Sequence, residues 1–196
     1  MGKYGVEPER RKALTDAAIQ AIGAHGSLDV TMSDIAARAG VSPALAHHYF
    51  GSKQQLITAS VRALLAELRA DAVTALKAAR SPRARISAII AISFSAKQFS
   101  DGTVAAWLAF YVHAQKSEDV RRLLALYGRR LNSNLMSGLS PLVGELDAAR
   151  IAEGAAAMID GLYIRKALGT AAARTDPVQL LEDHIATQIA SISRLD

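Results

Sequence analysis

One stretch in the first third of the chain contains two short helical patterns joined by a tight turn, and it constrains the fold most strongly. Thr31 is an N-cap residue, and Asp34 three positions later completes an acidic form of the capping box. Gly40 ends the first helix, where a left-handed backbone costs glycine little. Ser42 caps a second helix, and Pro43 occupies its first position. Two helices joined by a short turn that contains glycine predict a helix-turn-helix.

This pattern, over residues 31–53, predicts DNA binding. The second helix of a helix-turn-helix lies in the major groove, with its N-terminal residues at the base edges. Leu45 is expected to point inward. The side chains expected on the exposed side are Ala44, Ala46, His47 and His48. The alternative is two capped amphipathic helices in an ordinary helical bundle.

The motif resembles the DNA-binding domain of TetR-family transcriptional regulators over roughly residues 8–60. The family usually has Thr at position 31, Gly-Val-Ser at 40–42, Phe at 50 and Lys at 53, and this chain has all of them. At positions 47 and 49 the chain has His and Tyr, where the family commonly has a phosphate-contacting Tyr and often a His. Position 44 is Ala, where the family often has Gly.

The resemblance implies contacts to DNA phosphates and contacts to base edges. Thr31, Tyr49 and Lys53 are expected at phosphates, and Lys53 stands in the first turn of a helix, where a cation is disfavoured unless an anion is close by. A solvated lysine is the alternative. The full set of residues expected at DNA is Thr31, Ser42, Pro43, Ala44, His47, His48, Tyr49 and Lys53.

Charge alone does not identify the DNA-binding part. The chain of 196 residues has a net charge of +5, which favours polyanionic partners. Residues 1–55 carry six basic and five acidic side chains, so the basic excess lies mostly outside the motif. Four basic residues near the start of the first helix are expected either at phosphates or in solvent: Lys3, Arg10, Arg11 and Lys12. DNA affinity is therefore expected to depend on local placement, helix N-termini and dimerisation.

The remaining sequence predicts an all-α chain of about nine helices, with no strand pattern and no internal repeat. Residues 1–55 are predicted to form the helix-turn-helix domain and residues 56–196 a ligand-binding and dimerisation domain. Turns are expected at residues 100–102 and at residues 140–144. The helix before the second of these turns is expected to end near residues 137–138. The helices expected between the turns of the second domain include 53–80, 82–99 and one from Asp147 to Gly169.

Five residues of the second domain form a candidate site for a cationic ligand. Trp107, Phe110 and Tyr111 fall within one and a half helical turns, and Asp160 and Tyr163 share a face of another helix. Aromatic faces and a buried carboxylate suit a cation that cannot donate hydrogen bonds. Plain core packing is the alternative for each of these residues.

A narrower resemblance covers residues 103–111, 129–135 and 158–168, together with residues 3–11. These segments are similar to the betaine-pathway repressors, which are TetR-family proteins whose inducer is choline. The resemblance implies a homodimeric repressor of choline-to-glycine-betaine genes that choline releases from operator DNA. Ala155, Gly161 and the apolar residues between Leu180 and Ile192 are candidates for the dimer interface, unless they close the core of one subunit.

The sequence contains no motif of an enzyme. It has no phosphate-binding glycine loop, no His-Glu-x-x-His and no cysteine, so no catalytic residue, metal ligand or cofactor is expected. The chain also has no long apolar span and no apolar segment typical of a secretory signal, so a cytoplasmic location without membrane contact is expected. Two alternatives stay open: a repressor of an efflux or catabolic gene with another lipophilic or cationic ligand, and an all-α enzyme or scaffold.

Overall fold

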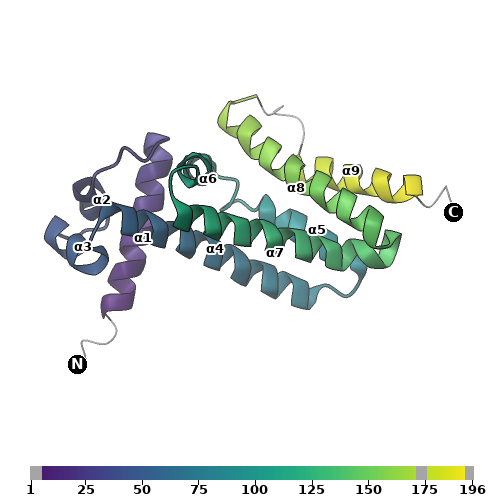
Figure 1. Ribbon diagram of the computed structural model, residues 1–196, viewed down its shortest axis with the longest axis horizontal. Helices are drawn as coiled ribbons and strands as arrows, with labels where there is room; N and C mark the ends of the chain where they lie inside the picture. The colour runs from purple at the N-terminus through teal and green to yellow at the C-terminus, as the bar shows by residue number, and fades with distance from the viewer. Residues whose placement is uncertain (1–5, 171–175, 193–196) are drawn as a thin grey trace. The chain divides into compact units, whose positions relative to one another are not determined.

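The computed structural model describes residues 6–170 and 176–192 (Figure 1). Within these ranges every regular element is an α-helix, as the sequence predicts. Residues 3–5, which belong to the N-terminal segment of the narrower resemblance, lie outside the described part. The nine described helices are α1 (Val6–His25), α2 (Met32–Arg38), α3 (Pro43–Phe50), α4 (Lys53–Ala78), α5 (Pro82–Ser93), α6 (Asp101–Ala114), α7 (Glu118–Val143), α8 (Glu145–Ala167) and α9 (Pro177–Ile192).

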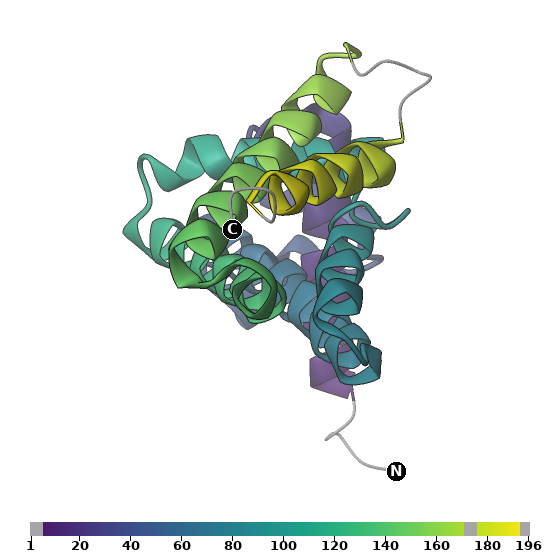
Figure 2. The same cartoon turned by 90° about the vertical axis from the view of Figure 1, so that its right-hand side faces the viewer.

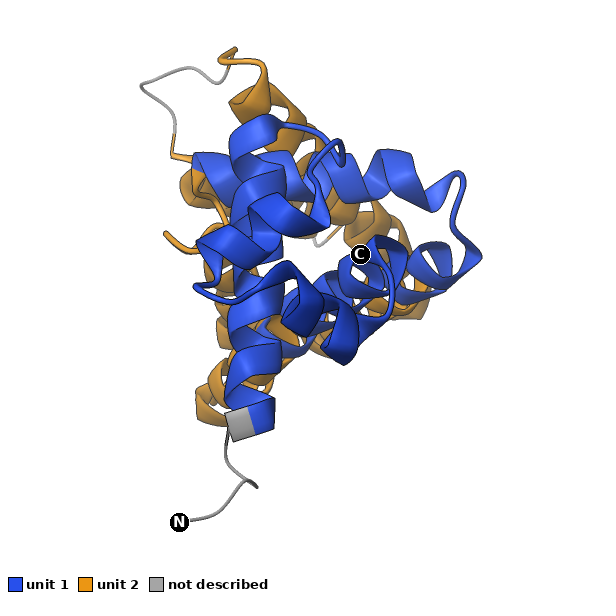
Figure 3. Ribbon diagram, turned by 90° about the vertical axis from the view of Figure 1, so that its left-hand side faces the viewer, with its two compact units in different colours: residues 1–67, 101–124 blue, residues 68–100, 125–196 orange. Residues whose placement is uncertain are grey.

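The chain forms two compact units, coloured separately in Figure 3. Unit 1 comprises Met1–Glu67 and Asp101–Leu124, and unit 2 comprises Leu68–Ser100 and Ala125–Asp196. Helices α4 and α7 each begin in unit 1 and continue into unit 2. The boundary predicted between residues 55 and 56 separates a DNA-binding domain from a ligand-binding domain, whereas the two units are defined by how compactly the chain packs. The predicted domain boundary therefore stays a prediction.

Unit 1 is built on the packing of α1 against α2 and α6. One face of α1 is buried, and its apolar residues recur at helical spacing: Leu14, Ala17, Ala18, Ala21 and Ile22. Gly23 allows the backbones of α1 and α6 to touch, because a Cβ atom at this position would overlap the backbone of Gly102. Gly102 is therefore part of a helix contact, and it lies within α6 rather than in the turn predicted at residues 100–102.

Unit 2 is held together by the packing of α9 on α8 and α5, and α8 and α9 lie side by side in Figure 2. Leu181 and Ile185 on α9 and Ala155 on α8 are fully buried within the chain. Arg83 on α5 adds an ion pair to Glu182 on α9, at 3.1 Å. These small and aliphatic residues therefore close the core of unit 2, one of the two roles that the sequence leaves open for them.

Two helix ends differ from the prediction by several residues, whereas α4 and α8 differ from theirs by at most two. α5 ends at Ser93 rather than at residue 99, because the chain turns at Phe94, whose ring packs against Phe99 at 5.2 Å between ring centroids. α7 continues to Val143, through the predicted end at residues 137–138, so most of the turn predicted at residues 140–144 is helical as well. Gly138 does not end the helix: a Cβ atom there would lie 2.7 Å from Ile86 Cγ1, so this glycine permits α7 to approach α5 closely. Within the described residues, no helix has the length and apolarity needed to cross a membrane.

Candidate DNA-binding surface and ligand site

The N-terminus of α2 has the capping box that the sequence predicts. The Asp34 backbone N–H donates to Thr31 Oγ1 at 3.1 Å, and the Thr31 backbone N–H donates to Asp34 Oδ2 at 2.9 Å. The Thr31 hydroxyl also donates to Asp34 Oδ2, at 2.7 Å. These hydrogen bonds from Thr31 favour the ionised carboxylate and lower the pKa of Asp34. Thr31 is exposed, so its hydroxyl lies at the surface where a phosphate contact is predicted.

Helix α3 presents most of the predicted base-reading residues to solvent. Ser42 Oγ accepts the Leu45 backbone N–H at 3.2 Å, as expected of an N-cap. The predicted residues that are exposed on or next to α3 are Ser42, Pro43, Ala44, His47 and His48. Ala46, which was expected on the exposed side, is fully buried, whereas Leu45 is half-buried. Ala46 and Phe50, four residues apart, form the buried face of α3, and α3 packs on α2.

Tyr49 and Lys53, the other two predicted phosphate contacts, are half-buried. The Tyr49 ring meets the His48 ring edge-on, at 5.5 Å between centroids. Lys53 Nζ donates to the Leu28 carbonyl oxygen at 3.2 Å. Lys53 therefore places a positive charge beside the connection between α1 and α2. The Leu28 carbonyl oxygen is an uncharged acceptor, so this contact leaves the charge of Lys53 available to a DNA phosphate.

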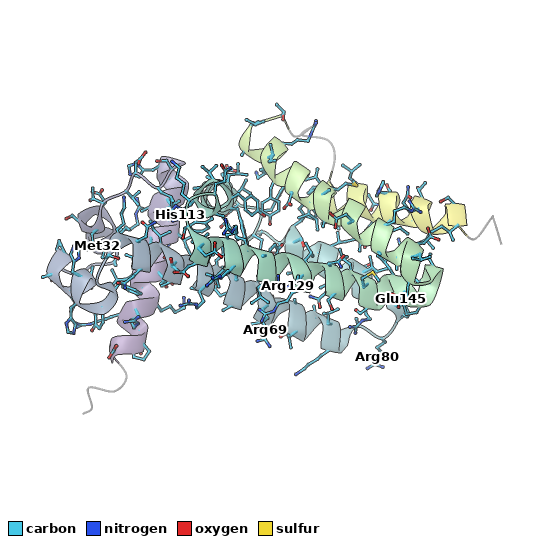
Figure 4. The ribbon with its side chains drawn as sticks, in the orientation of Figure 1. Met32, Arg69, Arg80, His113, Arg129 and Glu145 are labelled. Carbon is cyan, nitrogen blue, oxygen red and sulfur yellow. The ribbon has the colours of Figure 1, made fainter. Side chains whose placement is uncertain are left out.

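Next to Lys53, the first turn of α4 meets the end of α6. Gln54 Nε2 lies 3.0 Å from Nε2 of His113, which is labelled on α6 in Figure 4. Burial lowers the pKa of His113, and the positive charges of Lys116 and Lys53 lower it further. The neutral imidazole is thus favoured, and it accepts a hydrogen bond from the Gln54 amide.

The five predicted ligand residues are divided between the two units. Trp107, Phe110 and Tyr111 belong to unit 1, where the Trp107 and Tyr111 rings lie 5.8 Å apart. Trp107 is 2% exposed and Phe110 is 0% exposed, so both contribute to the core of unit 1. Asp160 and Tyr163 belong to unit 2.

In unit 2, Tyr163 is buried and Asp160 is exposed. Asp160 lies about one turn before Tyr163 on α8 and at the edge of its buried face, so its carboxylate is exposed rather than buried as predicted from the sequence. The Tyr163 hydroxyl donates to the Ser93 carbonyl oxygen at 2.6 Å. Burial raises the pKa of Tyr163, with smaller contributions from Tyr127 and from the Asp160 carboxylate.

Three aromatic residues near Tyr163 were not among the predicted site residues. The Phe94 and Phe99 rings lie 6.2 Å and 5.3 Å from the Tyr163 ring, and the Lys166 ammonium lies 5.5 Å from the Phe99 ring centre. Burial and the nearby Asp160 charge raise the pKa of Tyr127. The sequence has only four Phe and five Tyr, and this scarcity is the feature that could have indicated Phe94, Phe99 and Tyr127 as candidates for the same site. Among the described residues, no group of His, Asp and Glu is arranged to hold a metal ion.

Comparison with known families assigns both parts of the chain. Residues 14–59 match the family of bacterial regulatory proteins of the tetR type, and residues 82–190 match the C-terminal domain of BetI-type transcriptional repressors. The second match covers more than half of the chain. The chain belongs to the TetR family and has a BetI-type C-terminal domain. It is a DNA-binding transcriptional repressor of the TetR type, as the resemblance in the sequence implies.

Relatives and solved structures agree with this assignment. The HTH-type transcriptional regulator BetI of Rhizobium meliloti is 62% identical over 94% of this chain and 92% of its own length. BetI of Agrobacterium fabrum is 60% identical over 97% of this chain and 93% of its own length. A transcriptional regulator from Pseudomonas aeruginosa has a TM-score of 0.82 at 27% identity, covering 97% of this chain and 96% of its own.

A second solved structure has the same fold and contains a ligand. A transcriptional regulator from Saccharomonospora viridis, in complex with choline, has a TM-score of 0.76 at 22% identity and covers 93% of this chain and 96% of its own. At this identity the similarity extends to the TetR fold alone. The DNA contacts and the ligand residues of this repressor thus stay predictions from its sequence.

Proposed function

We propose that this chain represses the genes that convert choline to glycine betaine, and that choline releases it from its operator. The observation that carries the proposal is the match of residues 82–190 to the C-terminal domain of BetI-type repressors, because this is the part of the chain that the sequence predicts to bind the ligand. Two BetI proteins at 62% and 60% identity support it, and so does the choline found in a protein of the same fold. The protein acts in the cytoplasm by binding, without catalysis or a cofactor.

The residues proposed for the ligand are Trp107, Phe110 and Tyr111 in unit 1 and, separately, Asp160 and Tyr163 in unit 2. A quaternary ammonium group donates no hydrogen bond, so its binding requires aromatic faces and a negative charge at contact distance. Asp160 is the carboxylate proposed to supply the negative charge; burial raises the pKa of Tyr127 and Tyr163, and the Asp160 charge raises both further. Phe94 and Phe99 add aromatic surface around Tyr163.

The repressor is proposed to bind a palindromic operator as a homodimer. Two recognition helices must be held roughly 34–36 Å apart to read successive major grooves on one side of the duplex. Exposed apolar residues on α8 and α9, and at the C-cap of α8, supply a candidate surface in the described chain: Leu146 (90% exposed), Ile164 (45%), Leu168 (69%) and Leu180 (38%). Leu168→Asp should give a monomer in sedimentation, whereas Val112→Asp, at a residue of α6 that is 63% exposed, should stay dimeric. A dimeric Leu168→Asp variant would remove this face from the interface.

In this proposal the dimer has two states, and the spacing of the two recognition helices fits the operator in only one of them. Choline favours the state that does not fit. A ligand shifts such an equilibrium only through a difference in affinity for the two states. Choline is therefore expected to bind the DNA-free protein more tightly than the operator complex.

Calorimetry and operator release test the proposal together. Choline should bind the wild-type protein and release a fluorescent operator duplex, and Trp107→Leu and Asp160→Asn should weaken choline binding by about tenfold or more. Glycine betaine, which carries a carboxylate, should bind more weakly beside Asp160. Equal choline affinity in all three proteins would place the cation site elsewhere. No choline binding to the wild type, with release by another lipophilic cation, would support control of an efflux or catabolic gene instead.

A further inference from the structure

The C-terminal end of the recognition helix α3 is contacted by a side chain from α1. Arg11 Nη1 donates a hydrogen bond to the Tyr49 carbonyl oxygen at 2.6 Å, and its guanidinium lies over the Phe50 ring, 4.5 Å from the ring centre. Arg11 Nη1 also lies 3.9 Å from Oε1 of Glu7, which is one turn earlier on α1, and both side chains of this ion pair are exposed. We propose that Arg11 is a positioning residue for operator recognition, which fixes the orientation of α3 without itself contacting DNA.

The first argument is the shortness of α3. A helix of eight residues is marginal alone, and the last four carbonyl groups of any helix lack partners within it. At the end of α3 the Gly51 backbone N–H bonds to the His47 carbonyl oxygen at 2.7 Å, and the His47 ring Nδ1 lies 3.1 Å from the Gly51 carbonyl oxygen. Arg11 supplies a donor for the Tyr49 carbonyl and a positive charge at the negative end of the helix dipole.

The second argument is the direction from which Arg11 approaches. α3 packs on α2 through its buried face, which includes Ala46 and Phe50, so this packing holds the helix from one direction. Arg11 comes from α1 and holds both the backbone and the ring at the far end of α3. A planar guanidinium fixes direction better than a lysine, because it stacks and donates in one plane.

The third argument separates positioning from general stability. Arg11 lines an open cleft of about 580 Å³, together with Tyr49, Gly51 and Arg62. Removing the guanidinium therefore enlarges a cleft that water fills, and creates no buried cavity of the kind that destabilises a core. The loss should be felt at the orientation of α3 more than in the stability of unit 1.

The test compares Arg11→Met with Arg10→Met in the full-length protein. Both variants lose one positive charge from neighbouring exposed residues, but Arg10 makes no hydrogen bond or ion pair with any part of the chain that is described. The probes are an operator duplex selected from random DNA by the wild-type protein, and an unrelated duplex of the same length. Affinities are measured across a series of salt concentrations.

Arg11→Met should bind the operator at least about tenfold more weakly than Arg10→Met, while both bind the unrelated duplex alike and show the same salt slope. Equal operator affinities of the two variants would overturn the proposal. So would an equal loss on both duplexes with a slope shallower by about one unit, because this is the result of a lost phosphate contact.

Hydrogen exchange without DNA supplies a second measurement. Amides of residues 47–51 should exchange faster in Arg11→Met, and amides of α6 should not. Faster exchange throughout unit 1 would mean that Arg11 acts on stability, and would also overturn the proposal. Arg11→Lys keeps the charge without the planar fork, so it should restore less than half of the lost operator binding energy; full recovery would refute the role of the planar contact.

Discussion

The contact between Gly23 and Gly102 gives the sharpest test of how unit 1 is built. A Cβ atom at Gly23 would overlap backbone atoms of Gly102, which cannot move aside as a flexible side chain can. A Cβ atom at Gly102 meets no described heavy atom within 4 Å. Both glycines are helical and neither has a positive φ, so alanine is favoured by helix propensity at each position, by up to about 1 kcal/mol.

The difference between Gly23→Ala and Gly102→Ala therefore isolates the steric cost. Overpacking of this kind costs typically about 1–3 kcal/mol, because α1 and α6 must separate along their contact. For a chain of this length, this difference corresponds to about 2–12 °C in melting temperature. Gly23→Ala should be the less stable variant by this amount, and Gly102→Ala should be as stable as the wild type or slightly more stable.

Urea unfolding followed by tryptophan fluorescence measures this difference. Trp107 is the only tryptophan, it lies on α6, and it is 2% exposed, so its emission reports on the helix that must move. The midpoints are compared at equal slope m, which confirms that both variants expose the same surface on unfolding. Equal midpoints for the two variants would refute the close contact of α1 and α6 at this position.

Three further predictions concern the DNA-binding part. Lys53→Ala should weaken binding to all duplexes alike and make the salt slope shallower by about one unit; unchanged affinity would remove the phosphate contact. His48→Ala should change the sequence that is selected from random DNA while keeping the salt slope, and selection of the wild-type operator would exclude a base contact. Asp34 has a lowered pKa in the folded state, so its stabilising effect is present above its ordinary pKa near 3.8 and is lost as the pH falls through the lower folded value. Acid unfolding curves should therefore show a smaller loss of stability below pH 4 for Asp34→Asn than for the wild type.

Local patterns in the sequence determined the caps and turns of the helix-turn-helix. The hydrogen bonds between Thr31 and Asp34 and between Ser42 and Leu45 join residues three positions apart. Gly40 has a φ of 68°, as its place after α2 required. Such contacts depend on a few consecutive residues, so the sequence alone was sufficient to predict them. The buried faces of α1 and α4 are local in the same sense, because helical periodicity places their apolar residues on one side.

Only the tertiary structure decided what the small residues and the aromatic residues do. Ala46 looks like an exposed small residue in the sequence, yet it is buried in the described chain. Gly138 looks like a helix end, yet it permits a helix contact within α7. A glycine or alanine serves equally well at a turn, on a surface or in a close contact, so its role depends on which neighbour approaches it.

The same holds for Tyr163, whose hydroxyl binds the carbonyl group of Ser93, 70 positions earlier in the chain. Helical spacing relates Tyr163 to Asp160 on α8, but it does not reveal that one side chain is buried beside Phe94 and Phe99 while the other is exposed. Periodicity fixes the angle between side chains on one helix. Which of those angles faces the core depends on packing against other helices, and that is a property of the whole fold rather than of any stretch of its sequence.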